Sequence, residues 1–308
     1  MPSLGIRLSA ALAPLAVVLA CALSAAFLAY PVYWIADNAI GFQSLVNRCG
    51  QLLLLVSAFV AARVFCLGRR DIGVETRSRL FRQVASGIPL GIAMLGFHAL
   101  ALVALDVREL DLDTWANTQR LGLTALKALV IGLIVATIEE TMFRGILFAS
   151  LRKATGAATA SVVSAFYFAL LHFLRSDMKP VAADVEWATG FRLVGDALAH
   201  LPNLDLSSFL ALFLAGVFLA HIRMAFPMGL GYCIGIHAGW VCAIKTAKAA
   251  TNGVPGGNWS FLIGSYDGII GYLTAAWMSV LIVLLAVGMR RFYKAGQDTP
   301  EGLANESH

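Results

Sequence analysis

Three ionisable residues lie within one strongly apolar stretch, positions 131–150, which reads IGLIVATIEETMFRGILFAS. A charge at the centre of a membrane helix costs about 2.5–3.5 kcal/mol even on a lenient insertion scale, so these side chains must face the protein interior and find partners. Glu140 and Arg144 are four residues apart, so they share a helix face and can pair. Glu139 is rotated by about 100° from Glu140 and has no cation of its own. An unpaired, oriented carboxylate in a site of low dielectric is typical of a general base.

Two histidines lie in other apolar segments, His172 in SAFYFALLHF and His237 in CIGIHAGW. Counted along ideal helices from the nearest expected cytoplasmic turn, Glu139, His172 and His237 lie at similar depths of about 21, 24 and 21 Å. Taken alone, a membrane histidine is more often a hydrogen-bonded packing residue. A glutamate and two histidines together, however, can hold and deprotonate a water, either with a bound metal or without one.

The elements that carry these residues are expected to be membrane helices. Of the 308 residues, 59% are hydrophobic and 13% are charged, whereas a soluble domain has about 45–50% apolar and 25% charged residues. A soluble enzyme and a disordered chain are therefore excluded. Each membrane helix needs about 20 apolar residues, so we expect an all-α fold, a polytopic transmembrane helical bundle of about eight spans. The expected spans are approximately 8–34, 45–67, 85–105, 121–151, 157–174, 209–226, 228–247 and 269–289.

The net charge of +5 is explained by basic loops rather than by nucleic-acid binding. Basic residues at 69–82, at Arg152 and Lys153, at Arg223 and at 290–294 fall on one side if both termini are cytoplasmic. The expected location is the inner (plasma) membrane of a bacterium, with both termini inside. Part of the polar connection 175–207 is expected to lie in the membrane interface.

The location of these residues limits the possible substrates, because a site inside a bilayer can reach only lipids, transmembrane or lipidated peptides, and transported ions. The sequence contains no H-E-x-x-H, no G-x-S-x-G and no phosphate-binding glycine loop. The glycines of GLGYCIGIHAG would let helices approach closely around a hydrated cavity. The five cysteines form no C-x-x-C and are interpreted as small hydrophobic residues. A transporter that uses the same buried charges remains an alternative.

At these residues the sequence resembles the CPBP group of membrane proteins, also called the type II CAAX prenyl protease or Abi family. EETMFRG resembles the E-E-x-x-x-R motif, FALLH resembles F-x-x-x-H with Phe168 and His172, and GIHAGW resembles the third motif with His237. The three motifs occur in the family's order, and each lies within a hydrophobic span. The E-E-x-x-x-R and F-x-x-x-H pair argues against a transporter, which needs no such combination.

The resemblance implies an intramembrane endopeptidase in which Glu139 activates water, His172 and His237 complete the site, and Glu140, Arg144 and Phe168 support it. A divalent metal such as zinc, if one is bound, would be held by Glu139, His172 and His237. The expected partners are the lipid bilayer and a membrane-associated or lipidated peptide substrate, with no nucleic acid. The expected regions are 1–120, N-terminal helices with a basic cytoplasmic loop; 121–247, the catalytic core; and 248–308, the last helix and a polar tail.

One position departs from the family pattern. The third motif usually continues to an asparagine, or another polar residue, four residues after the histidine, and here that position is Val241. The asparagine is assigned to oxyanion stabilisation, a role worth about 2.7–4 kcal/mol where one donor was removed from another hydrolase. The sequence therefore also allows a catalytically silent relative that acts as a membrane scaffold or as a bacteriocin-immunity protein.

Overall fold

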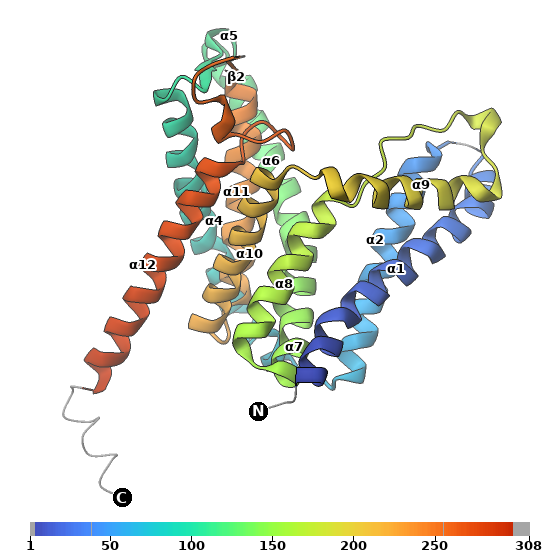
Figure 1. The fold of residues 1–308 in the computed structure, drawn as a ribbon. Helices are drawn as coiled ribbons and strands as arrows, with labels where there is room; N and C mark the ends of the chain where they lie inside the picture. The colour runs from blue at the N-terminus through green and yellow to red at the C-terminus, as the bar shows by residue number, and fades with distance from the viewer. Residues whose placement is uncertain (1–3, 38, 255, 298–308) are drawn as a thin grey trace, which may run out of the picture.

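The structure is a computed structural model that describes residues 4–37, 39–254 and 256–297, and it is predominantly helical (Figure 1). The eight longest helices are α1 (Leu4–Ile35), α2 (Phe42–Val64), α4 (Arg77–Ala104), α6 (Thr118–Glu140), α8 (Ala157–Phe173), α10 (Leu206–Ala225), α11 (Leu230–Ala250) and α12 (Tyr272–Gln297). Each of these helices overlaps one of the eight segments expected from hydropathy, and the all-α prediction is confirmed.

Shorter elements connect the long helices. They are α3 (Arg69–Ile72), β1 (Arg108–Leu110), α5 (Leu112–Ala116), the π-helical turn η1 (Thr141–Leu147), α7 (Phe148–Thr155), the 3₁₀ turn η2 (Ala182–Asp184), α9 (Trp187–His200), the 3₁₀ turn η3 (Leu201–Asn203), β2 (Thr251–Gly253) and the 3₁₀ turn η4 (Ser260–Leu262). The expected span at 121–151 is thus a composite of α6, η1 and α7.

Six helical segments are long and apolar enough to cross a membrane, so the chain is an integral, multi-pass membrane protein. They are Arg7–Ile35, Phe42–Val64, Arg69–Ala104, Thr118–Thr155, Leu206–Ala225 and Tyr272–Arg290. The expected number of eight spans is therefore approximate, because α8 is a shorter apolar helix and α11 does not meet the same criterion. Much of α11 is buried by its neighbours, and a helix enclosed by protein does not need a lipid-compatible surface.

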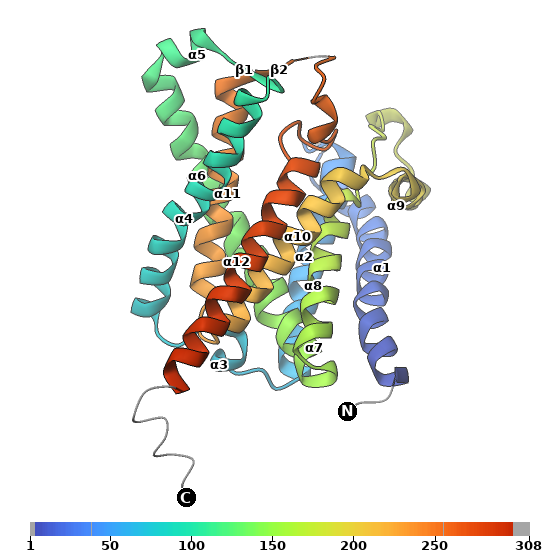
Figure 2. The same cartoon turned by 60° about the vertical axis from the view of Figure 1, so that its left-hand side comes forward.

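Helix α11 packs along α4 on one side and α6 on the other (Figures 1 and 2). The contact with α4 depends on glycine. A Cβ atom at Gly235 would lie 2.3 Å from the carbonyl oxygen of Val84, and a Cβ at Gly91 would lie 2.1 Å from that of Ile236. Larger side chains at these positions would force the two helices apart. The glycines near His237 therefore set the close approach that the sequence predicts.

Helix α9, in the connection 175–207, lies across α1 in Figure 1. A Cβ at Gly190 would lie 2.4 Å from the carbonyl oxygen of Ala26. The ring of Trp187 lies 4.5 Å from that of Tyr30, while Phe191 is exposed. An amphipathic helix with exposed aromatic residues suits the membrane interface, and the interfacial location of this connection stays a prediction.

The two ends of the bundle differ in charge. Helix α1 begins, and α12 ends, at the lower end of Figures 1 and 2, where α3 and α7 also lie. Basic side chains from α3, α7 and the end of α10 line one pocket there. At the opposite end, β1 pairs antiparallel with β2. The basic segments thus gather at one end of the molecule, and their exposure to the cytoplasm stays a prediction.

Candidate active site

Glu140 and Arg144 form a buried ion pair where α6 passes into η1. The Nη1 atom of Arg144 lies 3.2 Å from Oε1 of Glu140, and both side chains are 0% exposed. This is the pairing that the four-residue spacing indicates. The guanidinium carbon of Arg144 also lies 4.3 Å from the centroid of the Phe168 ring, which adds a cation–π contact. The charges of the pair therefore offset each other where water is excluded.

The π-helical turn η1 directly follows the two glutamates. Such turns have i to i+5 hydrogen bonds, are rare, and occur frequently at functional sites. Four consecutive residues of η1, from Phe143 to Ile146, are buried. A Cβ at Gly145 would lie 2.7 Å from Cγ2 of Ile72, so α3 packs directly against this turn. The apolar pattern of this segment in the sequence does not predict a π-helical turn.

His237 approaches the ion pair from α11. Its Nδ1 lies 2.8 Å from Oε1 of Glu140, and its side chain is 8% exposed. A carboxylate can only accept a hydrogen bond, so Nδ1 donates, and in the neutral imidazole Nε2 keeps its lone pair. Glu140 thus orients the ring and assigns its tautomer, as acidic partners of functional histidines commonly do.

Glu139 is more accessible than Glu140 and lies on the other side of His237. Its side chain is 27% exposed, and its Oε2 lies 3.9 Å from Nε2 of His237. Oε2 is itself buried and has no hydrogen-bond partner among the described residues. A separation of 3.9 Å is too long for a direct hydrogen bond, so the two groups face each other without bonding directly.

His172, near the end of α8, is linked to this cluster through Phe168. Its Nδ1 lies 2.7 Å from the carbonyl oxygen of Phe168, one helical turn back, so Nδ1 donates and Nε2 is the free nitrogen of the neutral ring. The Phe168 ring lies 4.8 Å from the His172 ring and 5.8 Å from the His237 ring. The structure therefore gathers the six residues singled out by the motifs around Glu140 and Phe168.

Tyr266, in the loop between β2 and α12, is a neighbour of the site that the sequence motifs do not include. Its ring lies 6.2 Å from the His172 ring, and the guanidinium of Arg175 lies 5.8 Å from its centroid. Burial raises the pKa of Tyr266, and the charges of Asp267 and Glu139 raise it further, against an opposing effect of Arg175. Tyr266 thus covers His172 from outside the helical core, and no pattern in its sequence neighbourhood signals this.

The loop that carries Tyr266 is fastened to the start of α10 by Asp205. The Asp205 carboxylate accepts hydrogen bonds from the backbone N–H and the hydroxyl of Ser265. It also accepts hydrogen bonds from the hydroxyls of Ser207 and Ser208, at 2.7 and 3.0 Å. Burial raises the pKa of Asp205, but these hydrogen bonds outweigh it and lower the pKa to about 2. Asp205 therefore caps α10 and holds the loop in place at neutral pH.

Val241 lies against α6 and brings no polar atom to the site. A Cβ at Gly132 would lie 3.1 Å from Cβ of Val241, which places this side chain in the contact between α11 and α6. Three buried nitrogen donors near His237 have no hydrogen-bond partner among the described residues, Nε and Nη2 of Arg144 and Nε1 of Trp240. The ring of Trp240 lies 6.3 Å from that of His237. Donors other than an asparagine are therefore present beside the histidine.

The residue types expected to bind a metal are present, but their spacing does not form a three-ligand site. Glu139, His172 and His237 supply the carboxylate and imidazole donors typical of catalytic zinc. Within residues 4–37, 39–254 and 256–297, however, no group of three or more His, Cys, Asp or Glu side chains is close enough to hold a metal ion. Zinc at these residues stays a prediction.

His98 is a polar residue of an apolar segment that lies outside the site. His98 lies in the core, with Nε2 at 3.2 Å from the carbonyl oxygen of Ile269 and at 3.1 Å from Oγ1 of Thr274. It thereby ties α4 to the start of α12. The five cysteines are all free thiols; Cys233 and Cys242 are buried, whereas Cys66 is exposed.

One comparison with known proteins bears on this site. Residues 121–243 match the family model described as Rce1-like, type II CAAX prenyl endopeptidase. The matched segment covers about two-fifths of the chain and runs from α6 into α11, so it includes Glu139, His172 and His237. No curated protein and no solved structure matches the chain.

Proposed function

Because residues 121–243 place the chain in the family of Rce1-like type II CAAX prenyl endopeptidases, we propose that it hydrolyses a peptide bond of a membrane-associated or lipidated protein with a water activated by Glu139. At the family level the chain is a CAAX-type intramembrane protease. The observation that carries the proposed mechanism is the 3.9 Å separation of the unpartnered Oε2 of Glu139 from Nε2 of His237. A water that contacts a carboxylate and an imidazole so placed would lie beside the line that joins the two atoms, within hydrogen-bond reach of both.

In the proposed reaction, Glu139 takes a proton from this water as the water oxygen attacks the scissile carbonyl carbon. The tetrahedral intermediate then collapses, the C–N bond breaks, and the protonated Glu139 returns the proton to the leaving nitrogen. His237 positions the water through Nε2, because its Nδ1–H is held by Glu140 at 2.8 Å. His172 presents its own Nε2 from the other side of Phe168.

The charge that develops on the carbonyl oxygen requires hydrogen-bond donors. Val241 supplies none, so we propose that Arg144 or Trp240 takes this role through its free, buried N–H group. Glu140 is then a positioning residue, since it fixes both Arg144 and His237. This division of labour gives the two adjacent glutamates different functions: Glu139 reacts with the water, while Glu140 holds the groups around it.

The substrate is proposed to carry a lipid, because the family is defined by prenylated substrates and the site lies among membrane-spanning helices. The test uses the full chain in liposomes and a peptide with a farnesylated cysteine three residues from its carboxyl terminus. We expect cleavage by wild type and a loss of about 10²- to 10⁴-fold in Glu139→Gln, the usual contribution of a general base.

The matched control is Glu109→Gln, the same substitution at an exposed carboxylate in β1, outside the site. It is expected to cleave at the wild-type rate. Equal cleavage by Glu139→Gln and wild type would refute the proposed mechanism. Equal cleavage of the peptide without its lipid would refute the proposed substrate class but leave the mechanism standing.

The proposed zinc is tested separately, by metal analysis of the purified protein and by cleavage before and after a chelator. If Glu139, His172 and His237 hold a metal, it would supply a Lewis acid for the water. Wild type should then contain about one metal ion per chain, and His172→Ala and His237→Ala should contain less. Unchanged cleavage and no bound metal would favour activation of water by the side chains alone.

One observation favours a second candidate function, that of a catalytically silent membrane scaffold or immunity protein. Val241 occupies the position of the family's asparagine, and its side chain packs on α6 at Gly132. The substitution Val241→Asn separates the two candidates. If the chain is silent only because it lacks this donor, the variant should gain cleavage of the farnesylated peptide. An active wild type would exclude the silent alternative.

A further inference from the structure

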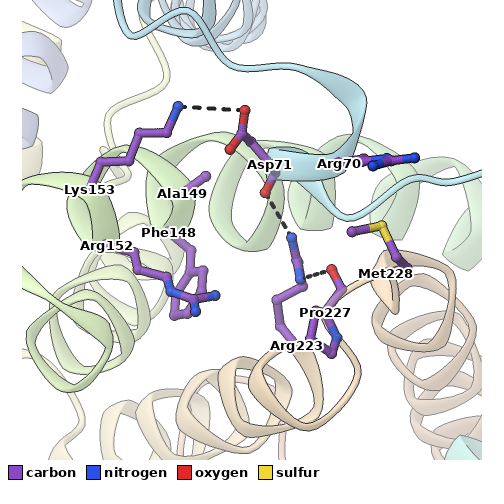
Figure 3. Close-up of a pocket in the computed structure, with 9 residues that line it drawn as sticks. All are labelled: Arg70, Asp71, Phe148, Ala149, Arg152, Lys153, Arg223, Pro227 and Met228. Atoms are coloured by element: carbon purple, nitrogen blue, oxygen red, sulfur yellow. Dashed lines mark hydrogen bonds and ion pairs between the residues drawn. The ribbon is translucent and has the colours of Figure 1, made fainter. Parts of the chain in front are cut away.

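A pocket of about 430 Å³ lies at the end of the bundle where α1 begins and α12 ends (Figure 3). Its walls come from α3, from α7 and from the turn between α10 and α11. None of the proposed active-site residues lines it. The pocket is therefore a feature separate from the site described above.

The pocket is rich in positive charge. Four cationic side chains line it, Arg70, Arg152, Lys153 and Arg223, against the single carboxylate of Asp71. That carboxylate is already engaged, since it lies 3.5 Å from Nζ of Lys153 (Figure 3). It also accepts a hydrogen bond from the backbone N–H of Gly68. Arg70 and Arg152 are exposed and have no ion pair with any residue that the structure describes.

Arg223 carries a positive charge into the floor of the pocket. Arg223 is only 3% exposed. Its Nη2 donates to the backbone carbonyl of Asp71 at 2.8 Å, and its Nη1 donates to the carbonyl of Pro227. Its Nε is buried without a partner among the described residues. Carbonyl oxygens satisfy N–H groups but do not neutralise the charge. Among the described residues Arg223 forms no ion pair, and the Asp71 carboxylate, which pairs with Lys153, acts on it only from a distance.

The chain around Arg223 is built to accommodate its side chain. Gly73 has a φ angle of 90°, and a Cβ at this position would lie 2.6 Å from the guanidinium carbon of Arg223. A glycine is required there for both reasons. Arginines that only set membrane topology need neither burial nor a shared pocket. The arrangement therefore calls for a further explanation.

We propose that this pocket binds a phosphate group, with Arg223 below it and Arg152 and Arg70 at its rim. Phosphate offers the negative charge that these residues lack and several acceptor oxygens that match guanidinium donors. The pocket lies at the ends of membrane-crossing segments, the level at which lipid headgroups lie. The phosphate group can come from an anionic phospholipid or from inorganic phosphate in the adjacent water. The inference does not depend on the proposed protease mechanism.

The test measures ligand binding to the purified full chain in an uncharged detergent. The probes are short-chain phosphatidylglycerol, phosphatidylcholine with the same acyl chains, and inorganic phosphate. Arg152→Gln removes an exposed rim cation without breaking any side-chain hydrogen bond or ion pair among the described residues, and it should fold normally. Arg77→Gln is the matched control, because Arg77 is an exposed arginine of the basic segment 69–82 and does not line the pocket.

We expect phosphatidylglycerol to bind more tightly than phosphatidylcholine, whose choline cation faces the arginines. Arg152→Gln should weaken this binding about tenfold, the effect of losing one charge-assisted hydrogen bond, and Arg77→Gln should leave it unchanged. Displacement of the lipid by inorganic phosphate supports a free phosphate as ligand, and binding that phosphate does not displace supports the lipid headgroup. Binding of neither phosphatidylglycerol nor inorganic phosphate, or equal weakening by Arg152→Gln and Arg77→Gln, would overturn the proposal.

Discussion

Replacing Glu140 with glutamine is expected to destabilise the protein far more than the same change at Glu139. Oε1 of Glu140 accepts hydrogen bonds from Arg144 at 3.2 Å and from His237 at 2.8 Å, and the Glu140 side chain is 0% exposed. Glutamine keeps an acceptor oxygen but loses the charge, so Arg144 becomes an uncompensated buried cation. Removing one partner of a buried ion pair costs about 3–5 kcal/mol.

Glu139, by contrast, is 27% exposed, and its Oε2 has no hydrogen-bond partner among the described residues. Glutamine at this position is expected to change the free energy of unfolding by about 0.5 kcal/mol or less. For a chain of this size, each kcal/mol shifts Tm by about 2–4 °C. We therefore expect Tm to fall by about 10 °C in Glu140→Gln and by no more than about 2 °C in Glu139→Gln.

The assay is thermal unfolding in a mild detergent, followed by tryptophan fluorescence, with Glu109→Gln as the control for loss of one carboxylate. The double variant Glu140→Gln/Arg144→Gln should recover part of the lost Tm, because it also removes the stranded cation. A Tm of Glu140→Gln within about 2 °C of wild type would refute the reasoning, as would a double variant whose loss is the sum of the two single losses.

Three further predictions concern the surroundings of the site. Tyr266→Ala should lower kcat for peptide cleavage with little change in Tm, because the tyrosine covers His172 from a loop. Tyr266→Phe should retain most of kcat. Equal kcat in wild type and in both variants would contradict this role. The pKa of Asp205 is lowered from 3.8 to about 2, so its stabilising contribution is complete above pH 4 and is lost as pH falls through 2. The difference in Tm between wild type and Asp205→Asn should therefore shrink over this range. A Tm difference that does not depend on pH would argue against this role. Cys66 is exposed next to α3. In a variant whose single cysteine is Cys66, a maleimide that cannot cross the membrane should label it only from the cytoplasmic side. Labelling from the outside would reverse the predicted orientation.

The membrane fold could be read from the sequence because hydrophobic runs long enough to cross a bilayer leave few alternatives to a helix. All eight expected segments are helical, and their predicted ends differ from the observed ends by several residues at some positions, as at α4 and α12. The number of spans was less certain, since α11 is shielded by other helices and carries Lys245 and Lys248 near its end. Hydropathy measures how compatible a segment is with lipid. A helix that is enclosed by protein does not need this compatibility, so hydropathy alone does not identify it as a span.

Part of the site could also be predicted from the sequence. Charges in an apolar run must be paired or functional, and a spacing of four residues places Glu140 and Arg144 on one helix face. The sequence therefore distinguished the paired Glu140 from the unpaired Glu139. Depth along the helices also indicated that His172 and His237 lie at the level of the glutamates.

Other features depended on the tertiary structure. Helical spacing within one segment says nothing about rotation of another, so only the packing of α11 against α6 decided that Nδ1 of His237 faces Glu140 and Nε2 faces Glu139. The π-helical turn η1 adds a residue to a turn without changing the apolar pattern. Tyr266 reaches His172 from a loop nearly a hundred residues further along the chain. Spacing along one helix is a local property that sequence determines, whereas the meeting of separate helices is decided by packing of the whole bundle.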